Sequence, residues 1–326
     1  MSDPSLILER MERAQASLIA RHAPGMRTRQ QRWSGGETRV LELGEGPPLL
    51  LVHGGLGSAC EWIPVVGRLA RHHRVIAIDR PGHGFATAFD YRKVDLADHG
   101  ARFLGEVLDA VELDAANLVG NSIGGYLTAA FAMAHPQRVA RLVLMGKPVG
   151  CNRGAPAPLR LLGLPIIGSA LARLAMSNPT PAANRKFWGD VLVANATALD
   201  DELIEVDCAH QSRNLASLLG LLRRVAAPGG TRRELVFGER WRELSMPTLL
   251  LWGQHDAFGP PHQAEAITSM TRQAHLIEVP GAGHLPWLDN PELCAASLES
   301  FLHPDPPVEA GGRASQHVAS DPGAAI

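Results

Sequence analysis

Cysteine and aromatic residues are scarce in this chain. Its 326 residues include four cysteines, and aromatic residues make up 5% of the total. The cysteines lie far apart, with no CxxC pair and no Cys/His ligand spacing, at positions Cys60, Cys151, Cys208 and Cys294. This distribution argues against a disulfide framework and a zinc site, and it favours a reducing compartment. We therefore expect a cytoplasmic protein with four buried thiols.

An excess of charge of one sign is also lacking. The chain has 31 Lys and Arg against 33 Asp and Glu, which gives a formal net charge of -2 at pH 7. Such a chain has no basic field to attract nucleic acid or an anionic membrane. No apolar run is long enough to span a bilayer, and charged residues interrupt the N-terminal segment MSDPSLILERMERAQ, unlike a signal peptide. We predict no nucleic-acid partner and no membrane insertion, and the oligomeric state stays open.

Short apolar runs alternate with helical patterns in two blocks of the chain. The first block, from about Arg39 to Met145, contains RVLEL, LLLVH, RVIAID, ANLVGN and ARLVLM, and the second contains TLLLWG and HLIEV. The stretches between these runs carry apolar residues at helical spacing. This alternation predicts an α/β protein with a mostly parallel sheet flanked by crossover helices.

The strand pattern is interrupted between the two blocks, where helix start signals such as Thr180-Pro181 and Asp200-Asp201 appear. The last residues are rich in Pro, Gly, Ala and Ser, and they have too few bulky apolar side chains to offset the entropy cost of ordering. We predict an N-terminal helical extension over residues 1–25 and a core domain in two parts, residues 26–146 and 247–302. A helical lid, residues 147–246, is inserted between these parts, and residues 303–326 form a disordered tail.

A serine flanked by glycines follows the fourth apolar run. The segment GNSIGG, residues 120–125, lies between the run NLV and the helical pattern YLTAAFAMAHP. A serine on such a strand-to-helix turn points its oxygen away from the sheet, and the glycines let the two backbones approach. The motif alone arises by chance on the order of 0.1 to 0.2 times in a chain this rich in glycine. Ser122 is therefore either a nucleophile or part of a packing turn, depending on its partners.

A nucleophilic serine needs a base, and the base needs a group that fixes its tautomer. His284 in PGAGHLPW follows the run HLIEV, and Asp256 in WGQHDAFGP follows TLLLWG. Both would lie beyond the carboxyl ends of strands, where α/β sheets bind ligands. An acid after ARLVLM is the alternative to Asp256, but the next carboxylate there, Asp190, lies deep in the predicted lid. The pattern predicts Ser122 as nucleophile, His284 as base and Asp256 as its orienting acid.

A tetrahedral intermediate also needs two preorganised donors. We expect one to be the N–H of Ile123, the residue after the serine. The other should come from HGGLG, residues 53–57, where the bare backbone lets the Gly55 N–H turn inward, with Leu56 as the fallback. The alternative is a glycine-rich turn without a ligand. Asp79 in DRPGHG is expected to hold a turn or cap a backbone N–H.

Five motifs, LVHGG, DRPGHG, GNSIGG, WGQHD and GAGHLPW, together resemble the α/β-hydrolase superfamily in their order along the chain. The resemblance implies the α/β-hydrolase fold with an inserted lid, and it extends from about Arg39 to Leu302. It also implies a catalytic triad and two oxyanion-hole donors, namely Ser122, Asp256 and His284 with the N–H groups of Gly55 and Ile123.

We expect a serine hydrolase that cleaves a carboxylic ester, thioester or lactone of a small apolar substrate through an acyl-enzyme, without a cofactor or a metal. GNSIGG also resembles the meta-cleavage-product hydrolases, which cut carbon-carbon bonds in ring-opened aromatic compounds. The chain departs from their pattern at Leu285, where they commonly carry Trp directly after the catalytic histidine. Carbon-carbon bond hydrolysis is thus one alternative, and a non-catalytic small-molecule receptor of the same fold is the other.

Overall fold

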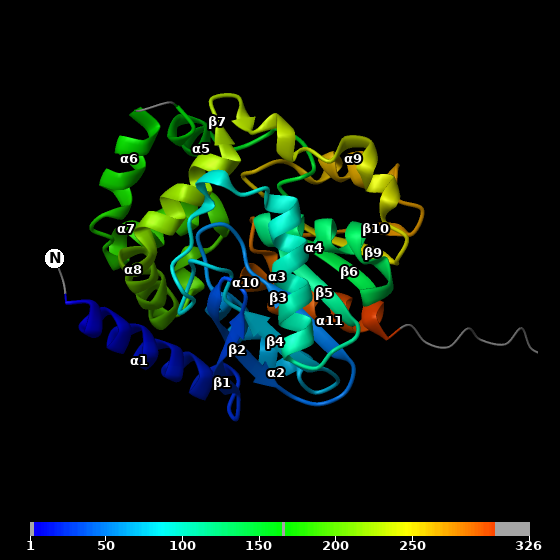
Figure 1. The fold of residues 1–326 in the computed structure, drawn as a ribbon, viewed down its shortest axis with the longest axis horizontal. Helices are drawn as coiled ribbons and strands as arrows, with labels where there is room; N and C mark the ends of the chain where they lie inside the picture. Colours follow the sequence, from blue (N-terminus) through cyan, green and yellow to red (C-terminus); the bar gives the residue numbers. More distant parts are fainter. Residues whose placement is uncertain (1–2, 165–166, 304–326) are drawn as a thin grey trace, which may run out of the picture.

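An eight-stranded sheet forms the centre of the protein in the computed structural model, which describes residues 3–164 and 167–303 (Figure 1). The strand order is β1-β2-β4-β3-β5-β6-β9-β10. Strand β2 pairs antiparallel with β1 and β4, and all other neighbours pair in parallel, so the predicted mostly parallel sheet is confirmed. The strands span Arg27–Trp33 (β1), Gly36–Leu43 (β2), Pro48–Val52 (β3), Arg74–Ile78 (β4), Ala116–Asn121 (β5), Val139–Met145 (β6), Thr248–Gly253 (β9) and Ala274–Val279 (β10).

Helices cover both faces of this sheet. One face packs against α2, α10 and α11, and the other packs against α3, α4 and α9. The Asp95 side chain caps α3, because it accepts hydrogen bonds from the N–H groups of Ala97 and Asp98. These helices span Ile63–Leu69 (α2), Leu96–Ala110 (α3), Ile123–Ala134 (α4), Glu265–Thr268 (α9), Pro286–Asp289 (α10) and Pro291–Leu302 (α11).

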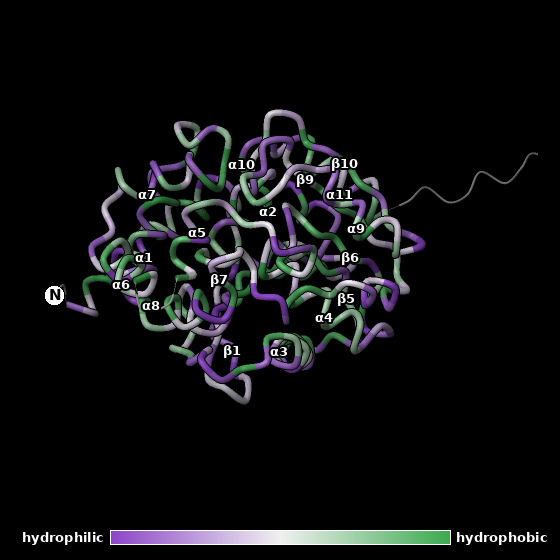
Figure 2. The backbone as a smooth tube through the Cα atoms, turned by 90° about the horizontal axis from the view of Figure 1, so that it is seen from above, coloured by the Kyte–Doolittle hydropathy of each residue, from purple (hydrophilic) through white to green (hydrophobic). Residues whose placement is uncertain are grey.

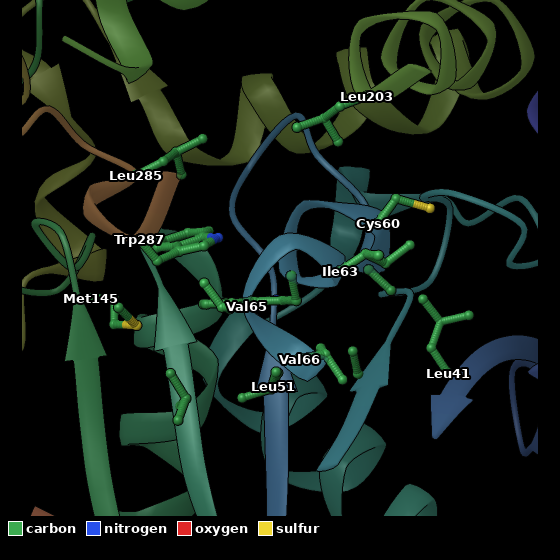
Figure 3. Packing of buried hydrophobic residues seen from close by; sticks show 14 of the residues in the cluster. Leu41, Leu51, Cys60, Ile63, Val65, Val66, Met145, Leu203, Leu285 and Trp287 are labelled. Atoms are coloured by element: carbon green, nitrogen blue, oxygen red, sulfur yellow. The ribbon is translucent and has the colours of Figure 1, made fainter. Parts of the chain in front are cut away.

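Alternate residues of β3 enter different cores. Leu49 and Leu51 face the core under α2 and α11, whereas Leu50 and Val52 face the core under α3 and α4. Side chains alternate across a strand, so a strand buried on both faces appears as a continuous apolar run. The first core extends from Leu51 in the sheet to Leu203 outside it (Figure 3). The sheet thus forms a rigid platform with a packed layer on each side.

The segment between β6 and β9, which we call the insertion, is mainly helical. Helix α1 (Pro4–His22) lies outside the insertion and packs against α8, the longest helix of the insertion. Both views place α1, α6, α7 and α8 at one end of the molecule (Figures 1 and 2). The insertion contains α5 (Ala157–Leu162), α6 (Ile167–Met176), α7 (Pro181–Phe187), α8 (Asp201–Val225) and a short hairpin formed by β7 (Ala226–Ala227) and β8 (Gly230–Thr231).

Both predicted helix starts are observed, but only one has the expected side-chain cap. Thr180 caps α7, because its hydroxyl accepts a hydrogen bond from the Ala183 N–H. The Asp200 side chain makes no capping bond at the start of α8. It pairs instead with Arg21 and His22 in the last turn of α1. Electrostatic attraction between the two helices therefore replaces the local cap at this position.

Strand β1 is not predicted from the sequence, where the first expected strand begins at about Arg39. Its sequence, RTRQQRW, buries only Trp33, and pairing with β2 rather than an apolar pattern makes it a strand. The predicted disordered tail lies outside the described residues, except for His303. All four cysteines are free and buried, as expected. No helix in the described ranges has the length and apolarity needed to cross a membrane.

Candidate active site

Ser122 alone connects β5 to α4. Strand β5 ends at Asn121 and α4 begins at Ile123, so the chain reverses direction at one residue. Ser122 has φ 54° and ψ -112°, and within the described ranges only Glu112 shares a positive φ among non-glycine residues. A residue held in such a conformation costs about 1–3 kcal/mol and is typical of functional sites. The geometry is that of the strand-to-helix turn expected from the sequence.

The glycines around Ser122 are required by close backbone approach. A Cβ atom on Gly124 would lie 2.3 Å from the carbonyl oxygen of Val52, at the end of the neighbouring strand β3. A Cβ on Gly120 would lie 2.4 Å from the hydroxyl of Thr128. Real Cβ atoms do not approach other atoms this closely. Glycine at both positions therefore lets α4 begin directly against the sheet.

Asp256 and His284 meet beyond the ends of β9 and β10. The His284 Nδ1 lies 2.9 Å from each carboxylate oxygen of Asp256. The same carboxylate accepts hydrogen bonds from the N–H groups of Lys147 (2.9 Å) and Phe258 (2.8 Å). An ionised carboxylate can only accept, so Nδ1 must carry the proton in this contact. The Nε2 atom is buried and has no hydrogen-bond partner among the described residues.

Two further contacts hold the His284 ring and its loop. The Phe258 ring stacks on the imidazole, with centroids 3.9 Å apart. The Asn121 Nδ2 donates to the carbonyl oxygens of His284 (3.1 Å) and Met145 (2.7 Å). The motif GNSIGG does not by itself indicate this role of Asn121. Asn121 thus connects the serine turn to the histidine loop.

Four of the five residues predicted for the site line one cavity of about 630 Å³, namely Ser122, His284, Gly55 and Ile123. The fifth, Asp256, lies behind His284 and contacts its ring. No hydrogen bond between the Ser122 hydroxyl and His284 occurs in the described structure. Catalytic hydrogen bonds often form only when substrate is bound. The unpartnered Nε2 leaves the acceptor available for a serine proton.

The amides of Gly55 and Leu56 face away from a buried arginine. Arg80 Nη2 donates to the carbonyl oxygen of Gly54 and to that of Gly55 (3.3 Å). In a trans peptide the carbonyl and the following N–H point in opposite directions. The N–H groups of Gly55 and Leu56 therefore point away from Arg80, and both residues line the cavity. Neither of these two N–H groups is therefore occupied by Arg80, and the role of either one as an oxyanion donor stays a prediction.

His210 of α8 links the insertion to this loop. Its Nε2 donates to the Leu56 carbonyl oxygen (3.0 Å), and its Nδ1 accepts a hydrogen bond from the Gly84 N–H (3.0 Å). Burial lowers the pKa of His210 to about 3, so the ring is neutral at physiological pH. The contact joins residues far apart in the chain, which explains why sequence reasoning missed it.

We expect the His210→Gln variant to be less stable and less active, because the hydrogen bonds of His210 to the Leu56 carbonyl and the Gly84 N–H are weakened or lost. The pKa of His210 is lower in the folded protein than in the unfolded protein, where it is about 6.5. The contribution of this group to stability is therefore present above pH 6.5 and is lost as the pH falls toward 3. Wild type should therefore lose roughly 2 kcal/mol relative to the variant between pH 7 and pH 5.

Chemical denaturation across this pH range measures the difference in unfolding free energy. The exposed His262→Gln variant is the matched control and should follow wild type. A constant difference between His210→Gln and wild type from pH 7 to pH 5 would contradict a neutral, buried His210.

The wall of the cavity is largely aliphatic and is supplied mainly by the insertion. Lys147 also lines it, and its Nζ donates to the carbonyl oxygens of Gly154 and Phe258. No group of three or more His, Cys, Asp or Glu side chains that could hold a metal occurs in the described part of the chain. The aliphatic residues include Leu159, Leu162, Leu218, Leu221 and Leu222.

Comparison with known proteins agrees with this architecture. The 2-hydroxy-6-oxononadienedioate/2-hydroxy-6-oxononatrienedioate hydrolase of Paraburkholderia xenovorans is 30% identical over 270 residues, covering 82% of this chain and 87% of that protein. The 2-hydroxymuconate semialdehyde hydrolase of a Pseudomonas species is 29% identical over 280 residues, covering 82% and 91%. The crystal structure of carboxylesterase CesB from Bacillus subtilis superposes with a TM-score of 0.71 at 21% identity, covering 91% and 98%. The model of the alpha/beta hydrolase family matches residues 49–297, and the chain belongs to this family.

Proposed function

We propose that the protein is a serine hydrolase in which Ser122 attacks a carbonyl carbon of the substrate. The proposal rests mainly on the hydrogen bonding of His284. Its Nδ1 is hydrogen-bonded to Asp256, and its Nε2 is buried without a hydrogen-bond partner among the described residues. Such a ring can accept one proton at Nε2 and is stabilised as an imidazolium by the carboxylate. Ser122 lines the same cavity on a strained turn.

The proposed reaction has two steps. The Ser122 oxygen bonds to the carbonyl carbon while its proton moves to Nε2 of His284, and the histidine then protonates the leaving group as its bond breaks. In the second step a water molecule gives a proton to the same nitrogen and attacks the acyl carbon. The bond between that carbon and the Ser122 oxygen then breaks, the histidine returns the proton to this oxygen, and a carboxylic acid is released. The amides of Gly55 and Ile123 are the proposed donors to the negatively charged oxygen in both steps.

Of the bonds considered from the sequence, the carbon-carbon bond has the better support. Both relatives described above are named as hydrolases, one of 2-hydroxy-6-oxononadienedioate and 2-hydroxy-6-oxononatrienedioate and the other of 2-hydroxymuconate semialdehyde. These names fit the resemblance to the meta-cleavage-product hydrolases that the sequence shows. We therefore place carbon-carbon bond hydrolysis ahead of the ester hydrolysis that the sequence analysis puts first. Lys147 adds support, because its ammonium has three donors and uses two of them on carbonyl groups. The third would serve a substrate carboxylate.

Ester hydrolysis is the second candidate, and the aliphatic cavity wall favours it. An ester of an apolar acid fills such a cavity through the hydrophobic effect and needs no counter-ion. The chemistry at Ser122 would be unchanged, since only the leaving atom differs between the two candidates.

A substrate panel separates the two candidates. We expect kcat/KM for 2-hydroxymuconate semialdehyde or 2-hydroxy-6-oxononadienedioate to exceed that for the best p-nitrophenyl ester by at least about tenfold. The esters should range from acetate to octanoate, and Ser122→Ala is the control for background hydrolysis. If kcat/KM for an ester exceeds that for both 2-hydroxymuconate semialdehyde and 2-hydroxy-6-oxononadienedioate, ester hydrolysis replaces carbon-carbon bond hydrolysis as the proposed function.

A further inference from the structure

The cavity contains two buried carboxyl groups that the proposed reaction does not use. Glu61 belongs to the short helix η1 (Ala59–Trp62), and Asp207 belongs to α8, which packs against η1. Glu61 is 4% exposed and Asp207 is 6% exposed, and both line the same cavity as Ser122. Buried carboxyl groups are normally paired with a cation or fully hydrogen-bonded.

The carboxyl group of Glu61 has no hydrogen-bond partner in the described part of the chain. Its Oε2 is buried without a hydrogen bond to any described residue. Its backbone, however, is fixed, because Trp287 Nε1 donates to the Glu61 carbonyl (2.8 Å) and the Trp287 ring stacks on Trp62 at 4.0 Å. A Cβ on Gly57 would lie 1.7 Å from Glu61 Oε1, so the glycine makes room for the carboxyl group. Burial, with a contribution from Asp207, raises the pKa of Glu61 well above its usual value.

Asp207 is held on one side only. Its Oδ2 accepts hydrogen bonds from Trp188 Nε1 (2.9 Å), Asn184 Nδ2 (2.9 Å) and Gln211 Nε2 (3.0 Å). These three donors fix the carboxyl plane, and no described residue donates to Oδ1. Burial raises the pKa of Asp207 to about 7, against the effect of the three hydrogen bonds. One oxygen of each carboxyl group is thus left for a partner from outside the chain.

The kind of partner follows from the charges around the pair. No Lys or Arg in the described ranges forms a salt bridge with Glu61 or Asp207. The buried Arg80 attracts Glu61 but donates its hydrogen bonds to the carbonyl oxygens of Gly54 and Gly55. Lys147 is engaged with two carbonyl groups elsewhere in the wall. An apolar substituent would leave both carboxyl groups unpaired, and a carboxylate would be repelled by them. A cation with several N–H donors would satisfy both groups and shift them to the ionised form.

We propose that Glu61 and Asp207 form a subsite for a positively charged, hydrogen-bond-donating group of the substrate, of which a primary ammonium is the simplest example. The subsite rests on the proposed function only in that the substrate enters the cavity of Ser122. A carboxylate on the same substrate would lie away from this pair, on the side of Lys147. A cationic group on the substrate is not part of the compounds named for the two relatives described above.

Binding of small ligands tests the subsite without any turnover. We expect calorimetry at about pH 8, where an alkylammonium is charged, to give a Kd for hexylammonium at least about tenfold lower than for the neutral hexanol. The preference should fall to within about threefold in the variant Glu61→Gln/Asp207→Asn, because the amides carry no charge. The exposed pair Asp190→Asn/Glu239→Gln removes the same charge from the surface and should keep the wild-type preference.

A second measurement covers the case in which the double variant does not fold. Hexylammonium should slow fluorophosphonate labelling of wild-type Ser122 more than hexanol does at equal concentration. The subsite is overturned if hexanol binds wild type as tightly as hexylammonium, or if the double variant keeps the preference. A protein that binds hexylammonium as expected but shows no labelling of Ser122 would contradict the proposed function and leave the subsite standing.

Discussion

The Ser122→Ala variant should lose turnover by roughly 10⁵- to 10⁶-fold in kcat, as expected when the nucleophile of a triad is removed. Alanine has no oxygen to form the acyl-enzyme, and the residual rate comes from binding and oxyanion stabilisation alone. The backbone strain at φ 54° applies equally to serine and alanine, so the unfolding temperature should change little.

Initial rates with the best substrate of the panel measure this loss. The exposed Ser177→Ala variant in the insertion is the matched control and should retain wild-type kcat. Ser122→Ala protein that retains more than about one hundredth of wild-type kcat would contradict a nucleophilic role, because the triad effect is several orders of magnitude larger.

The Asp256→Asn variant should lower kcat by about 10⁴-fold. An asparagine would present its NH₂ group to His284 Nδ1 or to one of the two backbone donors, Lys147 and Phe258, where an acceptor is needed. If the NH₂ faces the histidine, the proton moves to Nε2 and the ring can no longer act as a base. The rearranged hydrogen bonds should also destabilise the fold by about 1–3 kcal/mol.

The matched control for Asp256 is Asp190→Asn, which replaces the next carboxylate after ARLVLM. Asp190 is exposed and pairs with Lys186 on the surface of the insertion, so its loss should leave kcat unchanged within about twofold. A large loss in Asp190→Asn together with a small loss in Asp256→Asn would assign the orienting acid to the insertion and overturn the proposed triad.

Much of the sheet could be predicted from the sequence because its strands are buried on both faces. The run ANLVGN matches β5 at both ends, and TLLLWG matches β9. Strand β1 could not be predicted in this way, since an edge strand exposed to solvent need not be apolar. Only Trp33 of its seven residues is buried, and pairing with β2 determines its conformation.

The candidate site divides in the same way. Ser122, Asp256 and His284 follow strand ends and stand in recognisable motifs, so their positions could be predicted. The groups that orient them could not, because Asn121 and His210 act on backbone carbonyls of distant loops. Glu61 left a weak signal, a carboxylate within the otherwise apolar stretch ACEWIPVV.

The most direct test of the account is covalent labelling with a fluorophosphonate, followed by peptide mapping. We expect one adduct per chain, on Ser122, formed at a rate that falls at least about 10³-fold in His284→Ala, because the serine then lacks its base. An adduct on another residue, or an equal labelling rate in the two proteins, would contradict the assignment of Ser122 and His284 as nucleophile and base.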